Sequence, residues 1–325
     1  MIKRKFNILV ITPIKHIDGL YKKISSIGKI TYLENPTRNE ISKIIKNYEV
    51  IFTNPNKSKI FIDSEIIDKA ILLKIICTAS TGTNHIDVKY AHYKKINIIS
   101  ITNERKLINK ISSTAELAFA LTLSAIRNIN SACMSVLNGK WDYEEFIGDQ
   151  LNYLNVGVIG YGRLGSMYAK FCLAFGAKVF IYDPYKKVKT KKLIQIDSLE
   201  KICSISDIIA IHVHVNDETF NLISKKQFNL MKSTVVLVNT SRGDIINEKD
   251  AVYFLKKNNK AKIATDVLAD EIRSRPKSPL LKYSKQSNQV LITPHIGGMT
   301  KQAQFLAYHR AADLLNDELI KIKNV

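Results

Sequence analysis

Apolar and polar positions alternate with two different periods along this chain, and they predict strands and helices that follow one another almost from end to end. In the first hundred residues, short apolar runs typical of buried strands lie at 6–11, 30–33, 50–53, 74–77 and 96–100. Between them, apolar positions follow the helical spacing at 20–27, 38–46, 64–72 and 88–94. Because parallel strands need crossover connections, this alternation predicts a mostly parallel sheet with helices on its faces.

The pattern changes between residues 113 and 137, where an apolar stripe of Ala and Leu predicts one long, largely buried helix that ends before Gly139. A second alternation follows, with strands predicted at 156–159, 178–182, 208–211, 235–238, 262–265 and 290–292. The fold class predicted is α/β with two doubly wound, parallel-sheet (Rossmann-like) domains. The last helix, 301–321, is expected to return to the first domain.

A glycine turn separates the strand at 156–159 from a helix predicted to begin at Leu164. Its glycines are Gly160, Gly162 and Gly165. In a dinucleotide site the first permits the tight turn, the second lets the pyrophosphate approach the backbone, and the third lets the helix pack on the strand. The helix N-terminus supplies free amides for the phosphates, and Arg163 offers a charged donor. A purely structural glycine turn is the less favoured alternative.

An acid stands at the end of the next predicted strand, at Asp183. A carboxylate there accepts hydrogen bonds from the ribose hydroxyls and repels a 2′-phosphate, so the sequence favours NAD over NADP. Lys186 and Lys187 follow closely, and they leave acceptance of NADP open.

Three later segments each begin where a predicted strand of the second half ends, and they carry Arg242, Glu271 and His295. Strand carboxyl ends line the ligand crevice of a doubly wound sheet, so these side chains are expected to meet near the nicotinamide. A histidine exchanges a proton with a substrate hydroxyl, an acid steadies the imidazole, and an arginine binds a carboxylate in bidentate fashion. Taken singly, each residue has an ordinary surface or capping alternative.

These motifs, together with the run Ser80-Thr81-Gly82-Thr83-Asn84-His85-Ile86-Asp87 and with Thr114-Ala115-Glu116, occur in an order that resembles the D-isomer-specific 2-hydroxyacid dehydrogenase family, in particular its phosphoglycerate dehydrogenase-like members. The resemblance extends over nearly the whole chain. It implies hydride transfer between NAD and C2 of a 2-hydroxy or 2-keto acid. It also implies that Arg242 orients the substrate, that Glu271 pairs with the histidine, and that His295 donates and accepts the proton.

Further roles are implied by the same resemblance. The backbone of Thr81 and Gly82 would bind the substrate carboxylate. The residues around the cofactor would include His212, Thr240, Asp266 and Gly297 in addition to the glycine turn, Arg163, Leu164 and Asp183. The implied substrate (catalytic) domain is discontinuous, 1–105 with 298–325, and the NAD-binding domain is 106–297. A homodimer built around 113–137 is implied as well.

The substrate is left open by the sequence. Asn54-Pro55-Asn56-Lys57 follows the strand at 50–53, and with Arg105 or Lys106 it is a candidate phosphate site, although ordinary turn chemistry explains it equally well. Substrate contacts are therefore assigned to Asn54, Thr81, Gly82 and Arg242. A phosphorylated substrate such as 3-phosphoglycerate or 3-phosphohydroxypyruvate is slightly favoured, because a basic surface attracts a multiply charged anion.

Composition excludes several other classes. The net charge of +20 comes from lysines scattered along the chain without aromatic interleaving, so no nucleic-acid partner is expected. No long apolar run predicts a membrane span, and the basic start lacks the apolar length of a signal peptide, so a cytoplasmic protein is expected. The four cysteines, at 77, 133, 172 and 203, are too far apart for a metal site and are expected to be small buried residues. The remaining alternative is an NAD-sensing interaction protein that keeps the cofactor site without turnover.

Overall fold

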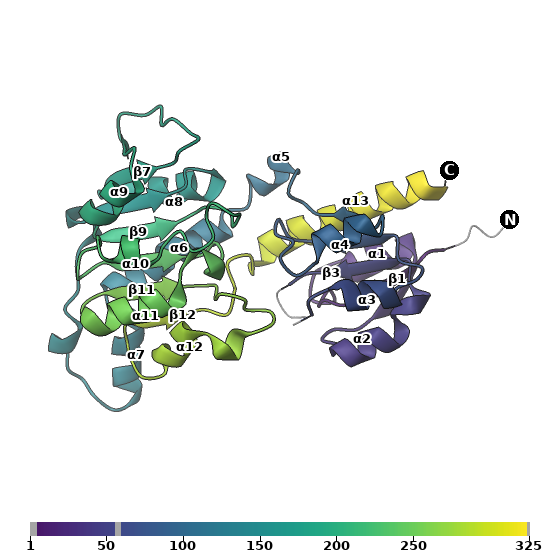
Figure 1. Cartoon of the computed structure of the whole chain (residues 1–325), viewed down its shortest axis with the longest axis horizontal. Coiled ribbons are helices and arrows are strands. Elements are labelled where there is room, and N and C mark those ends of the chain that lie inside the picture. Colours follow the sequence, from purple (N-terminus) through teal and green to yellow (C-terminus); the bar gives the residue numbers. More distant parts are fainter. Residues whose placement is uncertain (1–4, 56–59, 324–325) are drawn as a thin grey trace. The chain divides into compact units, whose positions relative to one another are not determined.

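The computed structural model describes residues 5–55 and 60–323 and divides the chain into two compact α/β units. Unit 1 comprises Met1–Ile111 with Met299–Val325, and unit 2 comprises Ser112–Gly298. Ile108 of helix α5 (Arg105–Ile108) is buried in the core of unit 1. Figure 1 shows unit 1 in purple, blue and, for its C-terminal helix, yellow, and unit 2 mainly in teal and green.

Unit 1 holds a five-stranded parallel sheet of order β2-β1-β3-β4-β5 within its described residues. The strands are β1 (Asn7–Val10), β2 (Lys29–Tyr32), β3 (Val50–Thr53), β4 (Ile75–Thr78) and β5 (Asn97–Ile99). Every residue of β3 and β4 is buried, which explains why these strands read as continuous apolar runs.

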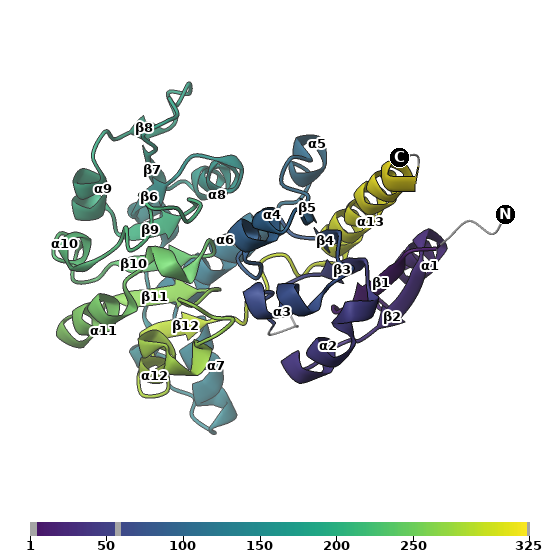
Figure 2. The same ribbon diagram turned by 45° about the vertical axis from the view of Figure 1, so that its right-hand side comes forward.

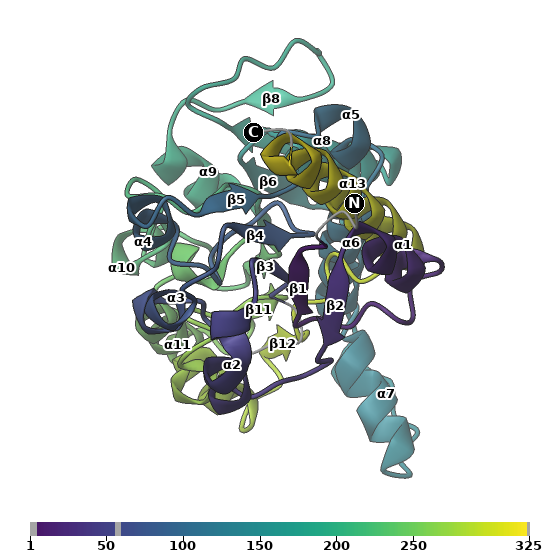
Figure 3. The same ribbon diagram turned by 90° about the vertical axis from the view of Figure 1, so that its right-hand side faces the viewer.

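Helices cover both faces of this sheet (Figure 3). On one face pack α1 (Leu20–Ile27), α5 and α13 (Lys301–Lys323), and on the other pack α2 (Arg38–Ile44), α3 (Ser64–Lys69) and α4 (Val88–Tyr93). Helix α13 buries Ala307, Ala311 and Leu315 in the core of unit 1. The last helix therefore returns to the first domain, as the sequence predicted.

Unit 2 holds a seven-stranded parallel sheet of order β12-β11-β10-β9-β6-β7-β8. The strands are β6 (Asn155–Ile159), β7 (Lys178–Tyr182), β8 (Ile194–Gln195), β9 (Ile208–Ile211), β10 (Val236–Asn239), β11 (Lys262–Thr265) and β12 (Val290–Ile292). The predicted α/β fold class with two parallel-sheet domains is confirmed. The sequence missed β8, because two residues at a sheet edge are too few to show a period.

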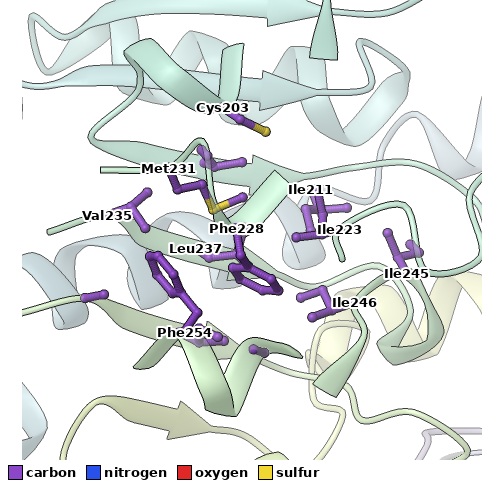
Figure 4. Packing of buried hydrophobic residues seen from close by; sticks show 14 of the residues in the cluster. Cys203, Ile211, Ile223, Phe228, Met231, Val235, Leu237, Ile245, Ile246 and Phe254 are labelled. Atoms are coloured by element: carbon purple, nitrogen blue, oxygen red, sulfur yellow. The ribbon is translucent and has the colours of Figure 1, made fainter. Parts of the chain in front are cut away.

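The two faces of this sheet carry separate hydrophobic cores. Helices α6 (Ser113–Ile126) and α8 (Arg163–Ala174) cover one face, and α9 (Leu199–Ile205), α10 (Lys225–Phe228), α11 (Glu248–Lys257) and α12 (Pro279–Ser284) cover the other (Figure 2). In the second core, Phe228 and Phe254 stack with ring centroids 5.2 Å apart, above Leu237 of the sheet (Figure 4).

The prediction of a single helix at 113–137 is wrong. Helix α6 ends at Ile126 and α7 (Ile129–Leu137) begins anew, because Asn128 adopts a left-handed conformation with φ of 54°. Lys262 stabilises this break, since its Nζ donates to the Ala125 carbonyl, 2.7 Å away, and to the Asn128 side chain.

Helix α7 is also not the buried helix that the sequence predicted. It has no buried residue and projects from the rest of unit 2 (Figure 3). Cys133 lies on it and is exposed, which corrects the prediction of buried cysteines; Cys77, Cys172 and Cys203 are buried. Among residues 5–55 and 60–323, no helix combines the length and apolar character needed to cross a membrane.

Strand order positions the candidate site of unit 2. The connections reverse direction between β6 and β9, which lie side by side. Ligands bind at such a switch point, beyond the carboxyl ends of the strands. The turn after β6 and the loops after β7, β9, β10, β11 and β12 all leave from these carboxyl ends. The site residues predicted in the second half lie in them or, for Arg163, Leu164 and Gly165, in the first turn of α8.

Candidate active site

The glycine turn after β6 is shaped by close backbone packing. Gly160 has φ of +91°, and a Cβ there would lie 2.6 Å from the carbonyl oxygen of His212. A Cβ on Gly165 would lie 2.0 Å from the carbonyl oxygen of Gly160. No side chain fits at either position, so helix α8 can pack against the turn only because both residues are glycine.

Gly162 is different, because nothing lies within 4 Å of the position that a Cβ would take. It is the N-cap of α8, a helix of 12 residues whose first-turn N–H groups lack partners within the helix. The backbone is therefore open where the positive end of the helix dipole favours phosphate. Arg163 and Leu164 form the first residues of α8, and both are half-buried.

Asp183 follows β7 and connects that strand to the glycine turn. Its Oδ2 accepts from the backbone N of Tyr161 at 2.7 Å, and its Oδ1 accepts from the backbone N of Tyr185 at 2.9 Å and of Lys186 at 3.0 Å. A carboxylate has roughly four acceptor positions, so about one remains for a ribose hydroxyl. Asp183, predicted from its sequence distance to the glycine turn, thus also holds that turn in place.

His212, at the end of β9, lies against the same turn. Both ring nitrogens are buried and have no hydrogen-bond partner among the described residues, and the ring packs on Tyr168 with centroids 5.0 Å apart. Burial lowers the pKa of His212 to about 3, so the imidazole is neutral at physiological pH.

His295 and Glu271 form the most direct side-chain pair of the site. His295 Nδ1 lies 2.5 Å from Glu271 Oε1, and the two side chains are 24% and 17% exposed. Since an ionised carboxylate only accepts, Nδ1 carries the hydrogen, and Nε2 is left for a substrate. His295 has φ of 58°, a conformation rare for a residue with a side chain. Glu271 Oε2 in turn accepts from the backbone N of Leu268 at 3.3 Å.

Arg242 lies close to this pair, in the loop after β10. Desolvation lowers its pKa, and the carboxylates of Glu271 and Asp244 raise it, so both acids are within electrostatic reach. The loop is held by the Asn239 side chain, whose Nδ2 donates to the Arg242 carbonyl at 2.8 Å. One guanidinium nitrogen donates to the Ser241 carbonyl at 2.6 Å, which leaves the other N–H groups of the fork for a ligand.

Asp266, at the end of β11, holds the loop that carries His295. Its carboxylate accepts from Thr293 Oγ1 at 2.6 Å, from Ile296 N at 2.8 Å and from Gly297 N at 2.7 Å. Burial raises its pKa, and these hydrogen bonds oppose that shift. Near this loop, the buried Thr240 Oγ1 has no partner among the described residues, as is typical of a hydroxyl that bonds a ligand.

The cluster of Arg242, Glu271 and His295 is supported by residues that the sequence did not reveal. Thr114, noted only as part of a motif, is the second residue of α6 and donates from Oγ1 to the Gly297 carbonyl at 3.1 Å. Glu248 and Asp244 accept from the backbone N of Ala269 and Asp270, at 2.8 and 3.2 Å, in the loop of Glu271. Glu248 reads in the sequence as an ordinary acid in the first turn of a helix, so no signal distinguished it.

The comparisons with known proteins agree with this geometry. Residues 119–297 match the model of the D-isomer specific 2-hydroxyacid dehydrogenase, NAD binding domain. The chain belongs to this family. It is 33% identical over 272 residues to the hydroxypyruvate reductase of Thermotoga maritima, which covers 83% of this chain and 85% of that protein.

Other family members match over nearly the full chain. The D-3-phosphoglycerate dehydrogenase of Methanocaldococcus jannaschii is 33% identical over 318 residues, 97% of this chain and 56% of that protein. The chain spans about half the length of the phosphoglycerate dehydrogenases that it matches. The D-lactate dehydrogenase of Aquifex aeolicus, solved with NAD and lactic acid, has a TM-score of 0.80 at 26% identity and covers 98% of this chain and 96% of that one.

The match to the family's NAD-binding domain thus contains the glycine turn and the cluster of Arg242, Glu271 and His295. The predicted substrate contacts other than Arg242 lie in unit 1. Thr81 and Gly82 follow β4, and their carbonyls accept from Thr102 Oγ1 at 2.8 Å and Ser80 Oγ at 2.5 Å. Asn54 follows β3 and is buried, and its Nδ2 donates to Tyr308 Oη of α13 at 2.5 Å. Asn56 and Lys57 of the candidate phosphate site lie outside the described residues.

Proposed function

We propose that this chain is an NAD-dependent oxidoreductase that interconverts a D-2-hydroxy acid and the corresponding 2-keto acid. The observation that carries the proposal is the hydrogen-bonded His295–Glu271 pair with Arg242 beside it, in loops that leave the same edge of the sheet as the glycine turn. Membership of the dehydrogenase family supports it. Bound NAD supplies the hydride acceptor or donor at its nicotinamide ring.

The side chains of unit 2 provide the remaining chemistry. In the reducing direction, the Arg242 guanidinium binds the carboxylate of the keto acid, and the protonated Nε2 of His295 donates to the carbonyl oxygen as that oxygen gains negative charge. Glu271 accepts from Nδ1 throughout and stabilises the imidazolium. In the oxidising direction, the neutral Nε2 takes the hydroxyl proton. The backbone of Thr81 and Gly82, as a second partner of the carboxylate, stays a prediction from the resemblance.

The decisive experiment follows NADH absorbance while a panel of 2-keto acids is offered. We expect consumption of NADH with at least one keto acid. In the reverse assay, with NAD, we expect formation of NADH from the D-2-hydroxy acid and none from its L-enantiomer. Binding of NADH without reduction of any keto acid would contradict the proposal, and it would support the alternative of an NAD-sensing protein.

For the substrate we propose a phosphorylated acid as the first candidate, with 3-phosphohydroxypyruvate reduced to 3-phosphoglycerate. The basic charge of +20 and the phosphoglycerate dehydrogenases among the relatives support it. The hydroxypyruvate reductase of Thermotoga maritima, a relative of similar length, makes unphosphorylated hydroxypyruvate the matched comparison. A kcat/KM for the phosphorylated acid that is no higher than for hydroxypyruvate would contradict this assignment.

We also propose a homodimer formed through the region around α7. Large apolar side chains are exposed there, among them Leu137 at 78%, Trp141 at 89% and Ile147 at 77%. Such a concentration of exposed apolar surface is typical of a protein–protein interface. In analytical ultracentrifugation we expect a dimer that the double variant Leu137→Ser, Trp141→Ser converts to monomer. A monomeric wild-type chain at micromolar concentration would contradict the proposal.

A further inference from the structure

Glu248 is a buried carboxylate that the proposed reaction does not use. It is the first residue of α11, after the N-cap Asn247, and it is 5% exposed. Its Oε1 accepts from the backbone N of Ala269 at 2.8 Å. Its Oε2 accepts from Ser278 Oγ at 2.5 Å and from the backbone N of Leu280 at 3.4 Å. One side chain thus accepts from three donors, one at residue 269 and two at residues 278 and 280.

These donors bracket the segment 269–278, which carries Glu271. The segment starts beyond β11 and ends at Ser278, which is the N-cap of α12 and accepts from Leu281 N at 3.1 Å. Between its ends, the side chains of Arg273, Arg275 and Lys277 are exposed. The segment is therefore held at both ends by Glu248 and is solvated in its middle.

The start of the segment is also in contact with the backbone next to Arg242. A Cβ on Gly243 would lie 1.9 Å from the carbonyl carbon of Leu268 and 2.2 Å from Ala269 N. Glu248 accepts from the N–H of Ala269 at this contact. The preceding residue, Leu268, donates its own N–H to Glu271. A shift of the segment would move Glu271 relative to both Arg242 and His295.

We propose that Glu248 is a positioning residue. By accepting hydrogen bonds from both ends of the segment 269–278, it fixes the position of the Glu271 carboxylate relative to His295. The proposal rests on the proposed dehydrogenase function. A displacement of about 1 Å in such a cluster costs roughly a hundredfold in rate, so a clamp at this place acts on catalysis as well as on stability.

The test compares Glu248→Ala, Glu248→Gln and Ser278→Ala with a matched control, Asp250→Asn. Asp250 lies two residues further along α11 and also accepts from a backbone donor, Lys225 N at 2.9 Å, but that donor belongs to α10. The control therefore neutralises a comparable carboxylate on the same helix without touching 269–280. For each protein, kcat and KM for the keto acid are measured against pH, and NADH affinity is measured by fluorescence.

We expect Glu248→Ala to lower kcat about ten- to a hundredfold with NADH affinity kept. The alkaline limb of the reduction profile should move to lower pH, because a displaced Glu271 stabilises the imidazolium of His295 less. Glu248→Gln keeps an acceptor for Ala269 N, but its amide NH₂ then faces the donors Ser278 Oγ and Leu280 N. Ser278→Ala removes only the hydrogen bond from Ser278. Both should lie between wild type and Glu248→Ala, while Asp250→Asn should keep the wild-type profile.

A purely structural role gives a different result. If Glu248→Ala or, should that variant not fold, Glu248→Gln melts at a lower temperature but keeps the wild-type kcat and pH profile, the proposal is overturned.

A second measurement does not depend on activity. Trypsin should cleave after Arg273 faster in Glu248→Ala than in Asp250→Asn at a temperature where both are folded. Should the wild type reduce no keto acid, the proposed function fails, and this measurement still decides whether Glu248 holds the segment: equal cleavage rates would overturn the clamp.

Discussion

The turn after β6 and the loops after β11 and β12 lie at the same edge of one sheet, and they are held in different ways. In the turn, Gly160 and Gly165 let backbone pack on backbone, and the empty space over Gly162 is left for a ligand. In the loops, buried carboxylates collect backbone N–H groups: Asp266 holds the segment of His295 and Glu248 holds that of Glu271. The packing of the glycine turn thus depends on the absence of side chains, with Asp183 accepting from the backbone of Tyr161, and the loops of His295 and Glu271 depend on buried carboxylates.

The largest expected effect separates catalysis from cofactor binding. His295→Ala should lower turnover by two or more orders of magnitude, because the proton donor is lost, while NADH affinity stays within a few-fold of wild type. Turnover of NADH and fluorescence titration measure the two quantities. His92→Ala, which removes an exposed histidine from α4, is the control. A variant at 295 with the wild-type rate would remove His295 from the mechanism.

The two kinds of glycine in the turn should respond differently to one methyl group. Gly165→Ala should lower the free energy of unfolding by about 1–3 kcal/mol, because its Cβ would lie 2.0 Å from the Gly160 carbonyl oxygen. Gly162→Ala should change it by less than about 0.5 kcal/mol but weaken NADH binding about tenfold or more. Denaturant titration and NADH fluorescence distinguish the two. An unchanged NADH affinity in Gly162→Ala would mean that the phosphates do not approach at this residue.

The packing of His212 against the turn should make stability depend on pH. Burial lowers its pKa from 6.5 to about 3, so between these values the unfolded chain binds a proton that the folded chain does not. The free energy of unfolding should therefore fall with decreasing pH in this window, by up to about 1.4 kcal/mol per pH unit from this residue.

His212→Phe isolates that contribution, because Phe fills the site without titrating. Denaturant titrations from pH 7 to pH 5 should show a smaller loss of stability in the variant than in wild type. Parallel curves for the two proteins would show that His212 does not titrate differently on folding.

The smallest expected effect concerns Asp183, where a side chain contributes to the cofactor part of the site. Asp183→Ser removes the charge that repels a 2′-phosphate, and Lys186 and Lys187 are exposed beside it. The ratio of kcat/KM for NADPH to that for NADH should rise about tenfold, or about 1.4 kcal/mol. The variant loses the three backbone hydrogen bonds that Asp183 accepts, which can lower the amount of folded protein. Such a loss affects both cofactors equally and cancels in the ratio. An unchanged ratio would assign cofactor choice to other residues.

Where sequence and structure disagree, the cause is tertiary. The helix expected at 113–137 has continuous helical spacing, but Lys262 of strand β11 stabilises a left-handed residue at Asn128, and α6 ends before it. Cys133 has an apolar context in the sequence, yet it is exposed because α7 stands away from the core. Asn54, whose contact with substrate stays a prediction, donates from its amide to Tyr308, 254 residues away, and no local pattern could reveal that bond.

The sequence by itself predicted most of the strands, the helices on their faces, the glycine turn and the polar side chains of Arg242, Glu271 and His295 after strands of the second sheet. These depend on local spacing: period in apolar positions, glycine where no Cβ fits, and polar residues just after buried strands. Only the tertiary structure decided which side chains hold the loops of His295 and Glu271, because Asp266 and Glu248 accept from donors about 20 to 30 residues further along the chain. A buried carboxylate accepts from the N–H groups that the fold brings close to it, and the sequence between acceptor and donor does not show which groups will pair.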